Sequence, residues 1–200
     1  MKLIYSLLIL IILLFIWSAI KPFEYFTWFL EVSPAIIGIL VLVFTFKKLR
    51  FTNLIYILIF VHCAILIVGG HYTYAEVPLF DWIQDVLNQQ RNNYDKLGHF
   101  AQGFVPAMIA RELLIRKEVI NSDKWLNFIV VCIALAISAT YEFIEWGVSL
   151  TTGEGGDSFL GTQGYIWDTQ SDMLFAAIGS IVALILLSKV HNKQLKSIKN

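Results

Sequence analysis

An acid and a histidine lie one helical turn apart at the start of an apolar stretch of this 200-residue chain. Asp95, His99 and Gln102 occupy positions i, i+4 and i+7, so a helix would carry all three on one face. Ionisable side chains within a membrane are energetically costly and normally face the protein interior or water, with a partner. Asp95 can hold the imidazole in one tautomer, as an acid–base or metal-binding histidine requires. Asp95 and His99 are therefore candidate catalytic residues and Gln102 a candidate binding residue; a hydrogen bond that only joins two helices is the alternative.

Two glutamates, Glu142 and Glu145, stand three residues apart near the end of a longer apolar stretch. Two carboxylates so close to the edge of the hydrocarbon need a cation, a basic partner or a shared proton. We therefore take Glu142 as a candidate catalytic and metal-binding residue and Glu145 as a candidate binding residue. The alternative is that both carboxylates reach water beyond the interface.

A glycine-rich acidic segment follows, from Thr151 to Asp172, with four acids, five glycines and no lysine or arginine. Asp168 and Asp172 lie one helical turn apart in it. Together with Asp157 they could bind a hard divalent cation through oxygen atoms, and with His99 they could form a mixed nitrogen and oxygen site of the zinc type. A solvated acidic loop with capping aspartates is the alternative. The expected cofactor is an unidentified divalent cation, with His99, Glu142, Asp168 and Asp172 as its candidate ligands.

Long apolar stretches must position these side chains. Hydrophobic residues make up 58% of the chain, against about 45–50% apolar in soluble domains, which indicates a membrane protein. A span takes roughly 20 apolar residues. The second span could begin as early as Trp28, and the fourth is the least apolar. We predict an all-α polytopic fold in one membrane domain, residues 1–200, with six spans at 3–20, 33–46, 54–70, 97–115, 126–150 and 173–190.

The charges are distributed unevenly between the two sides of these spans. Twelve of the fifteen lysines and arginines fall on the side of both termini, so the positive-inside rule places both termini in the cytoplasm. Twelve of the fifteen acids fall on the other side, which with its three basic residues sums to −9. The candidate residues above therefore face outward.

A short helix is predicted in the outer loop of residues 71–96. Its apolar residues follow the spacing i, i+3, i+4, i+7, i+8, and polar residues occupy the opposite face. This pattern is typical of a helix lying flat in the outer headgroup layer, and a helix packed on the bundle is the alternative. Either arrangement would make a lid or wall over the ends of the spans. The apolar positions are Leu79, Trp82, Ile83, Val86 and Leu87.

The cytoplasmic side offers less chemistry. Arg111 lies about 18 Å from His99 along a helix, too far to reach the outer residues. We expect it to form an ion pair at membrane depth or to extend to the interface. The basic tail beyond Val190 is expected to set the topology and to attract anionic lipid.

Several motifs of the chain resemble those of the YjdF-like bacterial inner-membrane proteins, a family without an established activity. The resemblance implies a multi-pass protein of the bacterial cytoplasmic (inner) membrane. The polar and aromatic residues of these motifs complete the candidate binding set, which is His71, Gln102, Glu145, Asp157, Gln163 and Trp167. The matching segments are His71 to Tyr74, Tyr94 to Phe100, Tyr141 to Trp146, Gly156 to Gly164 and Trp167 to Met173.

A looser similarity links the chain to VanZ-like membrane proteins, which are associated with glycopeptide-antibiotic resistance. Their Asp-Lys-x-x-His-Phe pattern is matched by residues 95–100, and Glu142 stands for their later glutamate. Their final Asp-x-x-x-Asn-x-x-Gly pattern is matched by Asp172 and Gly179, with Ala176 in place of the asparagine. This similarity implies a resistance or accessory role.

Three functions are compatible with these features. The first is binding of a cation, a lipid headgroup or an antibiotic-like ligand, and the second is a metal-dependent enzyme acting on a lipid or lipid-linked substrate at the outer leaflet. A transporter is disfavoured, because it should carry polar groups at mid-depth and on both sides. The expected partners are membrane lipids and a lipid-linked or amphiphilic ligand, with no nucleic acid, and the oligomeric state stays open.

Overall fold

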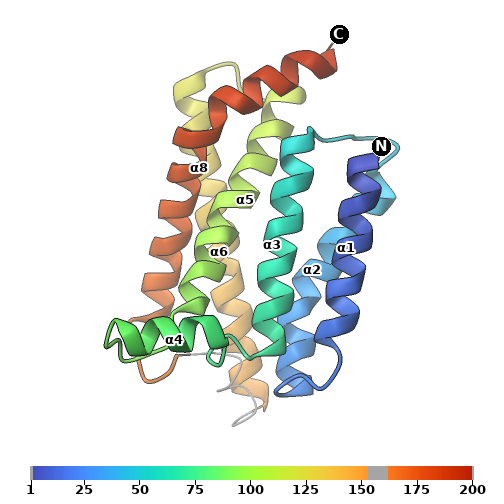
Figure 1. Cartoon of the computed structure of the whole chain (residues 1–200). Coiled ribbons are helices and arrows are strands. Elements are labelled where there is room, and N and C mark those ends of the chain that lie inside the picture. The colour runs from blue at the N-terminus through green and yellow to red at the C-terminus, as the bar shows by residue number, and fades with distance from the viewer. Residues whose placement is uncertain (1, 153–161, 200) are drawn as a thin grey trace.

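The computed structural model describes residues 2–152 and 162–199, and every regular element in that part of the chain is a helix (Figure 1). The predicted all-α class is confirmed. The helices are α1 (Lys2–Ser18), α2 (Tyr25–Thr45), α3 (Asn53–His71), α4 (Pro78–Val86), α5 (Tyr94–Arg116), α6 (Asp123–Thr152) and α8 (Asp168–Lys199).

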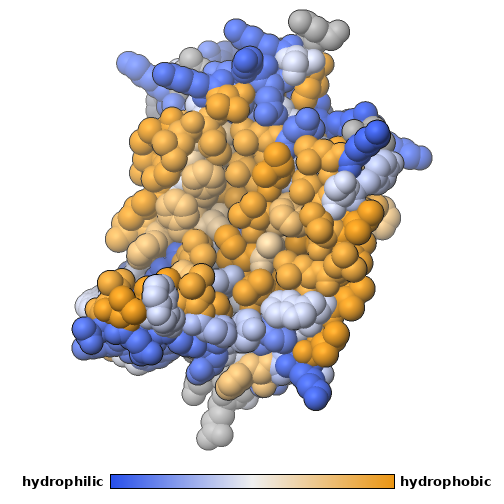
Figure 2. All heavy atoms as spheres, in the orientation of Figure 1, coloured by the Kyte–Doolittle hydropathy of each residue, from blue (hydrophilic) through white to orange (hydrophobic). Residues whose placement is uncertain are grey.

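Four of the described helices, α2, α3, α6 and α8, are long and apolar enough to cross a membrane. The α1 helix is apolar but shorter, at 17 residues, and α5 carries too many polar residues to meet the same criterion. All six run between the same two ends of the molecule (Figure 1). On the face shown in Figure 2, an apolar belt extends across the molecule between two hydrophilic ends, as a bilayer requires.

The α2 helix begins well before the predicted start of its span at residue 33. Glu24 explains the early start, because its carboxylate accepts hydrogen bonds from the backbone N–H groups of Phe26 (2.8 Å) and Thr27 (2.5 Å). These N–H groups lack partners within the helix, so the side chain caps it. Partial burial favours a raised pKa for Glu24, but the hydrogen bonds from Thr27 and Phe26 outweigh it and hold the pKa below its ordinary value. Pro34 therefore lies inside α2.

The α5 helix occupies the centre of the bundle, where it packs on α3, α6 and most extensively on α8. Two glycines allow the backbones of α5 and α8 to touch. A Cβ atom at Gly103 would lie 1.8 Å from the carbonyl oxygen of Ala176, and one at Gly179 would lie 2.1 Å from that of Phe100. Small residues at a crossing let membrane helices approach closely. Because neighbours surround α5, its polar side chains face protein instead of lipid.

The two ends of the bundle differ. Both termini lie at one end, where the last part of α8 bends across the other helices (Figure 1). The residues beyond Val190 thus continue α8, and His191 and Leu195 are buried there. We call this the terminal end. The α4 helix crosses the opposite end, which we call the α4 end (Figure 1).

The predicted short helix of the 71–96 loop is present as α4. Its N-terminal part is anchored by Phe80, whose ring packs edge-on against Tyr94 at a centroid distance of 5.1 Å. Ile83 is half-buried, and the remaining large apolar side chains of α4 and its C-cap are exposed, as expected for a helix whose apolar face lies in the headgroup layer. The exposed residues are Leu79, Trp82, Val86 and Leu87.

Candidate functional site

Polar side chains from four helices meet near the α4 end of the bundle. We call this set the histidine–carboxylate cluster. The α5 helix occupies its middle, α6 and α8 supply acids from either side, and α2 supplies one more acid. The members are Glu31, Asp95, Lys96, His99, Glu142, Glu145, Asp168 and Asp172.

The buried imidazole of His99 has oxygen atoms around both ring nitrogens. Its Nε2 atom lies 3.3 Å from Asp95 Oδ1 and 3.8 Å from Asp172 Oδ1. Its Nδ1 atom lies 3.2 Å from Gln102 Oε1 and 3.7 Å from Glu142 Oε1. Asp95, His99 and Gln102 therefore lie on one face of α5, as their helical spacing predicts. The imidazole can donate an N–H to a carboxylate, or accept from a protonated carboxyl group, on any of three different helices.

Two cations hold the acids of α8 in place. The Nζ atom of Lys96 lies 2.6 Å from Asp168 Oδ1 and 2.6 Å from Asp172 Oδ1, and 3.5 Å from Asp95. The guanidinium of Arg91 lies 2.5 Å from Asp168 Oδ1 and also donates to the carbonyl oxygen of Thr162. Asp168 is therefore engaged by both cations, while Asp172 also faces the imidazole.

The carboxyl groups of the cluster outnumber its cations. Six carboxyl groups face two permanently charged side chains, and a protonated His99 would still leave three in excess. Within the described part of the chain, no lysine or arginine forms a salt bridge with the three glutamates of the cluster. Buried carboxylates need protons or a cation, because charges are poorly solvated inside a protein. These glutamates are Glu31, Glu142 and Glu145, which are 5%, 6% and 8% exposed. Glu142 also lies 3.7 Å from His99 Nδ1.

A small cavity of about 20 Å³ opens between His99, Glu31 and Glu145. It is large enough for about one water molecule or ion. Tyr141 donates a hydrogen bond to Glu31 Oε2 at 3.4 Å on its wall. Most of the polar lining atoms are oxygens, which suit a cation or a proton-bearing water. The polar lining residues are Glu31, Tyr74, Asp95, His99, Gln102, Tyr141 and Glu145.

The closest set of metal-ligating atoms belongs to Asp95, His99 and Asp172, whose ligand atoms all lie within 4.8 Å of one another. Two members, His99 and Asp172, belong to the predicted ligand set. Asp168 instead contacts Arg91 and Lys96. The third member of the set is Asp95 instead of the predicted Asp168. Asp95 lies one helical turn before His99 on α5, which brings its carboxylate next to the imidazole.

The other predicted binding residues are placed differently. Gln102 and Glu145 line the cavity. Gln163 forms a two-point clamp outside it, accepting from Asn92 N at 3.0 Å and donating to Asn92 O at 2.9 Å. Trp167 is exposed on the surface. Asp157 lies outside the described residues.

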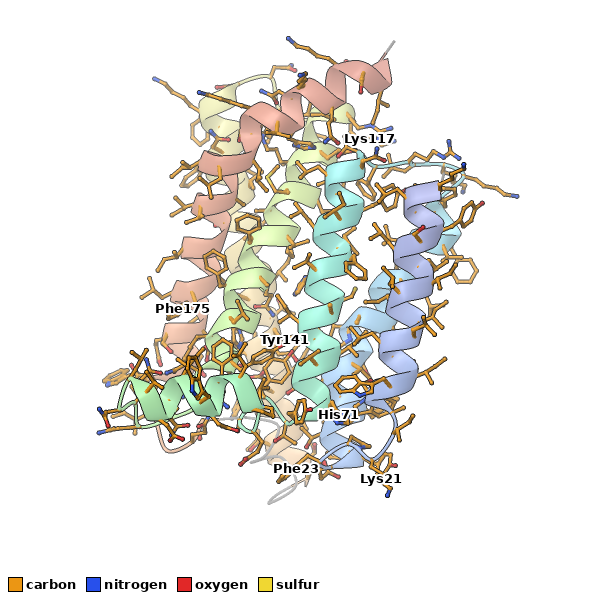
Figure 3. The ribbon with its side chains drawn as sticks, in the orientation of Figure 1. Lys21, Phe23, His71, Lys117, Tyr141 and Phe175 are labelled. Carbon is orange, nitrogen blue, oxygen red and sulfur yellow. The ribbon has the colours of Figure 1, made fainter. Side chains whose placement is uncertain are left out.

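His71 lies at the same end of the molecule but outside the cluster. Its Nδ1 atom lies 2.9 Å from the carbonyl oxygen of Ser18, and its ring stacks near Trp17 at 4.4 Å. The backbone N–H of Phe23 donates to the His71 carbonyl. His71 therefore ties the α1–α2 connection to the end of α3 (Figure 3).

Glu31 was missed by sequence reasoning. It lies within the apolar α2 helix and is buried beside the cavity. An acid inside an apolar stretch is itself a signal, because such residues normally face the protein interior. A predicted span that begins at residue 33 excludes Glu31, whereas the earlier start at Trp28 includes it.

A second buried polar network, at the terminal end, was also unexpected in its extent. Glu112 is fully buried and accepts from Thr52 N (3.0 Å), Thr52 Oγ1 (2.8 Å) and Arg116 (3.1 Å), and its Oε2 lies 2.9 Å from His191 Nε2. Arg111 NH1 lies 2.9 Å from His191 Nδ1. Arginine can only donate, so His191 accepts at Nδ1 and donates from Nε2. Arg111 is therefore linked to the Glu112 carboxylate through the His191 imidazole.

Comparison with known proteins agrees with the resemblance drawn from the motifs. Residues 3–193 match a family described as "Predicted membrane protein (DUF2238)". The chain is 49% identical over 184 residues to "Inner membrane protein YjdF" of Escherichia coli (strain K12), covering 92% of this chain and 88% of that protein. No solved structure matches. The predicted relationship to YjdF-like proteins is confirmed, and the chain belongs to the DUF2238 family of predicted membrane proteins.

Proposed function

We propose that this protein is a single inner-membrane domain with six spans and both termini in the cytoplasm, and that its histidine–carboxylate cluster binds a divalent cation near the outer face. The six spans are α1, α2, α3, α5, α6 and α8. The 17 residues of α1 are at the short end of the range for a span. Polar residues are tolerated in α5, because its neighbours cover them.

The orientation is supported by the distribution of basic residues. Both termini and Lys117 lie at the terminal end, and Lys21 lies at the α4 end (Figure 3). Cytoplasmic loops retain lysine and arginine, so the terminal end is cytoplasmic. The α4 end, with the cluster, then lies at the outer side of the membrane.

This orientation is tested by single cysteines in a protein from which Cys63 and Cys132 have been removed. A membrane-impermeant maleimide added to intact cells should label Lys21→Cys and leave Lys193→Cys unlabelled until the cells are opened. The reverse pattern would overturn the orientation.

Cation binding rests chiefly on one observation, the approach of ligand atoms from Asp95, His99 and Asp172 to within 4.8 Å of one another. One nitrogen and two carboxylates are a donor set that Zn²⁺ and Mn²⁺ accept. Further support comes from the acid charge nearby, since no lysine or arginine in the described part of the chain forms a salt bridge with Glu31, Glu142 or Glu145. A divalent ion would offset two of these negative charges.

Lys96 has a positioning role in this proposal. It holds Asp168 and Asp172 together at 2.6 Å each, so Asp172 is oriented before any ion arrives. A positioned ligand loses less conformational freedom on binding. Lys96 also balances part of the acid charge, so the cluster does not need a highly charged ion.

Equilibrium dialysis of the detergent-purified protein against Zn²⁺ and Mn²⁺ tests the proposal. We expect saturable binding to one site, weakened roughly 10–100-fold by His99→Ala. His71→Ala is the matched control, because this histidine lies at the same end but outside the cluster. Equal binding by the wild type and His99→Ala, or no saturable binding, would refute the site.

A further inference from the structure

A larger pocket lies beside the cluster, between α4, α5 and α8, with a volume of about 620 Å³. This volume falls within the range of small-molecule sites. The pocket has its own lining, apart from Lys96, which it shares with the cluster. Figure 2 shows hydrophilic atoms set back between α4 and the apolar belt above it.

The polar part of the pocket wall carries positive charge. It comprises two cations, two amides and the hydroxyls of Ser171 and Tyr165, and none of the described residues that line the pocket is an acid. Arg91 and Lys96 lie over the same Tyr165 ring, at 5.7 and 5.8 Å from its centroid, so the two cations reach one region of the wall. The polar residues are Gln89, Arg91, Asn93, Lys96, Tyr165 and Ser171.

The acids of the cluster fix this positive wall. Asp168 contacts both Arg91 (2.5 Å) and Lys96 (2.6 Å), and neither acid of α8 lines the pocket. The two cations are therefore held in place before a ligand arrives. A guanidinium beside an ammonium is the arrangement that recognises the oxygens of a phosphate group.

The rest of the wall is apolar and mostly aromatic. Phe80 comes from α4, Leu97 and Phe100 from α5, and Phe175 from α8. Figure 3 places Phe175 on α8 just above α4, where the apolar belt meets the hydrophilic end. A ligand whose polar group reaches Arg91 would therefore have its apolar part along these rings, at the depth of the first methylenes of a lipid.

We propose that this pocket binds a phosphate-headed lipid, with the phosphate at Arg91 and Lys96 and one acyl chain along Phe100 and Phe175. This inference goes beyond cation binding and needs no ion in the cluster. Only the leaflet, the outer one, rests on the proposed orientation. A cationic headgroup is disfavoured, because the described lining holds two cations and no acid.

The test is photo-crosslinking of the purified full chain in detergent with a phosphatidic acid that carries a diazirine in its acyl chain. We expect crosslinks on the peptides that contain Phe100 and Phe175. Asn93→Asp places a negative charge in the wall with almost no change in shape, although it also replaces the amide N–H₂ that donates to Gln89 and to the Arg91 carbonyl, and it should lower labelling about tenfold. Asn88→Asp is the matched control, because Asn88 is exposed and lies outside the pocket.

A second variant fills the pocket instead of changing its charge. Ser171→Trp should also abolish labelling, whereas Leu174→Trp, on the exposed side of α8, should leave it unchanged. Variants that elute from size-exclusion chromatography like the wild type are compared. Unchanged labelling in both Asn93→Asp and Ser171→Trp would overturn the proposal.

Two further comparisons separate the ligand classes and the two proposals. Equal labelling by a phosphatidylcholine analogue would overturn the requirement for an anionic head, and displacement by millimolar inorganic phosphate would assign the site to free phosphate instead of lipid. His99 does not line the pocket, so His99→Ala should retain lipid labelling even where cation binding is lost. Asn93→Asp should conversely retain bound cation, so the failure of one proposal is distinguishable from that of the other.

Discussion

The network around Glu112 should make a large contribution to stability, and the structure indicates its size. Both oxygens of this carboxylate are occupied, by Thr52, Arg116 and His191, and the side chain is 0% exposed. In Glu112→Gln an amide N–H₂ replaces one oxygen and faces an N–H donor at either position, either Thr52 N and Arg116 or His191 Nε2; the Thr52 hydroxyl is the one partner among these that can accept. His191 cannot compensate by changing tautomer, because its Nδ1 must accept from Arg111. Breaking a buried pair in this way costs roughly 3–5 kcal/mol.

This loss corresponds to a fall in Tm of roughly 6–20 °C for a chain of this size. A thiol-reactive fluorescent dye measures it, because Cys63 is buried and becomes reactive on unfolding. Cys132 is exposed and is first replaced by Ala. Glu118→Gln, the same change at an exposed position, is the control. If the two variants melt within 2 °C of each other, the network does not stabilise the fold as the structure implies.

Two smaller predictions concern the helices that carry the site. Hydrogen bonds lower the pKa of Glu24, so the cap stabilises α2 at pH values above the ordinary pKa of a glutamate, and this stabilisation is lost as the pH falls through the lowered pKa. Glu24→Gln should therefore reduce stability by roughly 1 kcal/mol at pH 7 and by less at pH 3. An equal loss of stability at both pH values would contradict this. Gly179→Ala should destabilise the α5–α8 contact, because its Cβ would lie 2.1 Å from the Phe100 carbonyl oxygen. The Cβ of Gly147→Ala would meet nothing within 4 Å, so this control should be neutral or stabilising in the same melting assay. Equal effects of the two changes would show that the contact tolerates a methyl group.

The sequence predicts that Asp95, His99 and Gln102 share one face of α5, because they repeat at helical spacing and ionisable groups in an apolar stretch face the interior. Their approach to Glu142 and Asp172 depends on how α6 and α8 pack against α5, which the sequence alone does not show. The division of roles between Asp95 and Asp168 did not follow. It depends on where Lys96 and Arg91 reach, and long flexible side chains are not constrained by sequence spacing.

Contacts between distant segments could not be predicted from the sequence. Thr52, Glu112 and His191 are separated by 60 and 79 positions, and none has a helical partner pattern that points to the others. Burial of the segment beyond Val190 depends on the bend of α8 over the bundle, while its basic composition is typical of a solvated tail. The start of α2 was misplaced because its cap is a glutamate, which is not among the preferred capping residues.

Elemental analysis of the protein as purified in detergent tests the proposed cation site most directly. Wild type, His99→Ala and His71→Ala are measured in parallel by mass spectrometry of the metals, with protein concentration from amino-acid analysis. We predict close to one divalent ion per chain in the wild type and in His71→Ala, and its loss in His99→Ala. No metal in the wild type, or the same content in His99→Ala, would contradict the proposal and leave the cluster as a network of carboxyl groups that share protons.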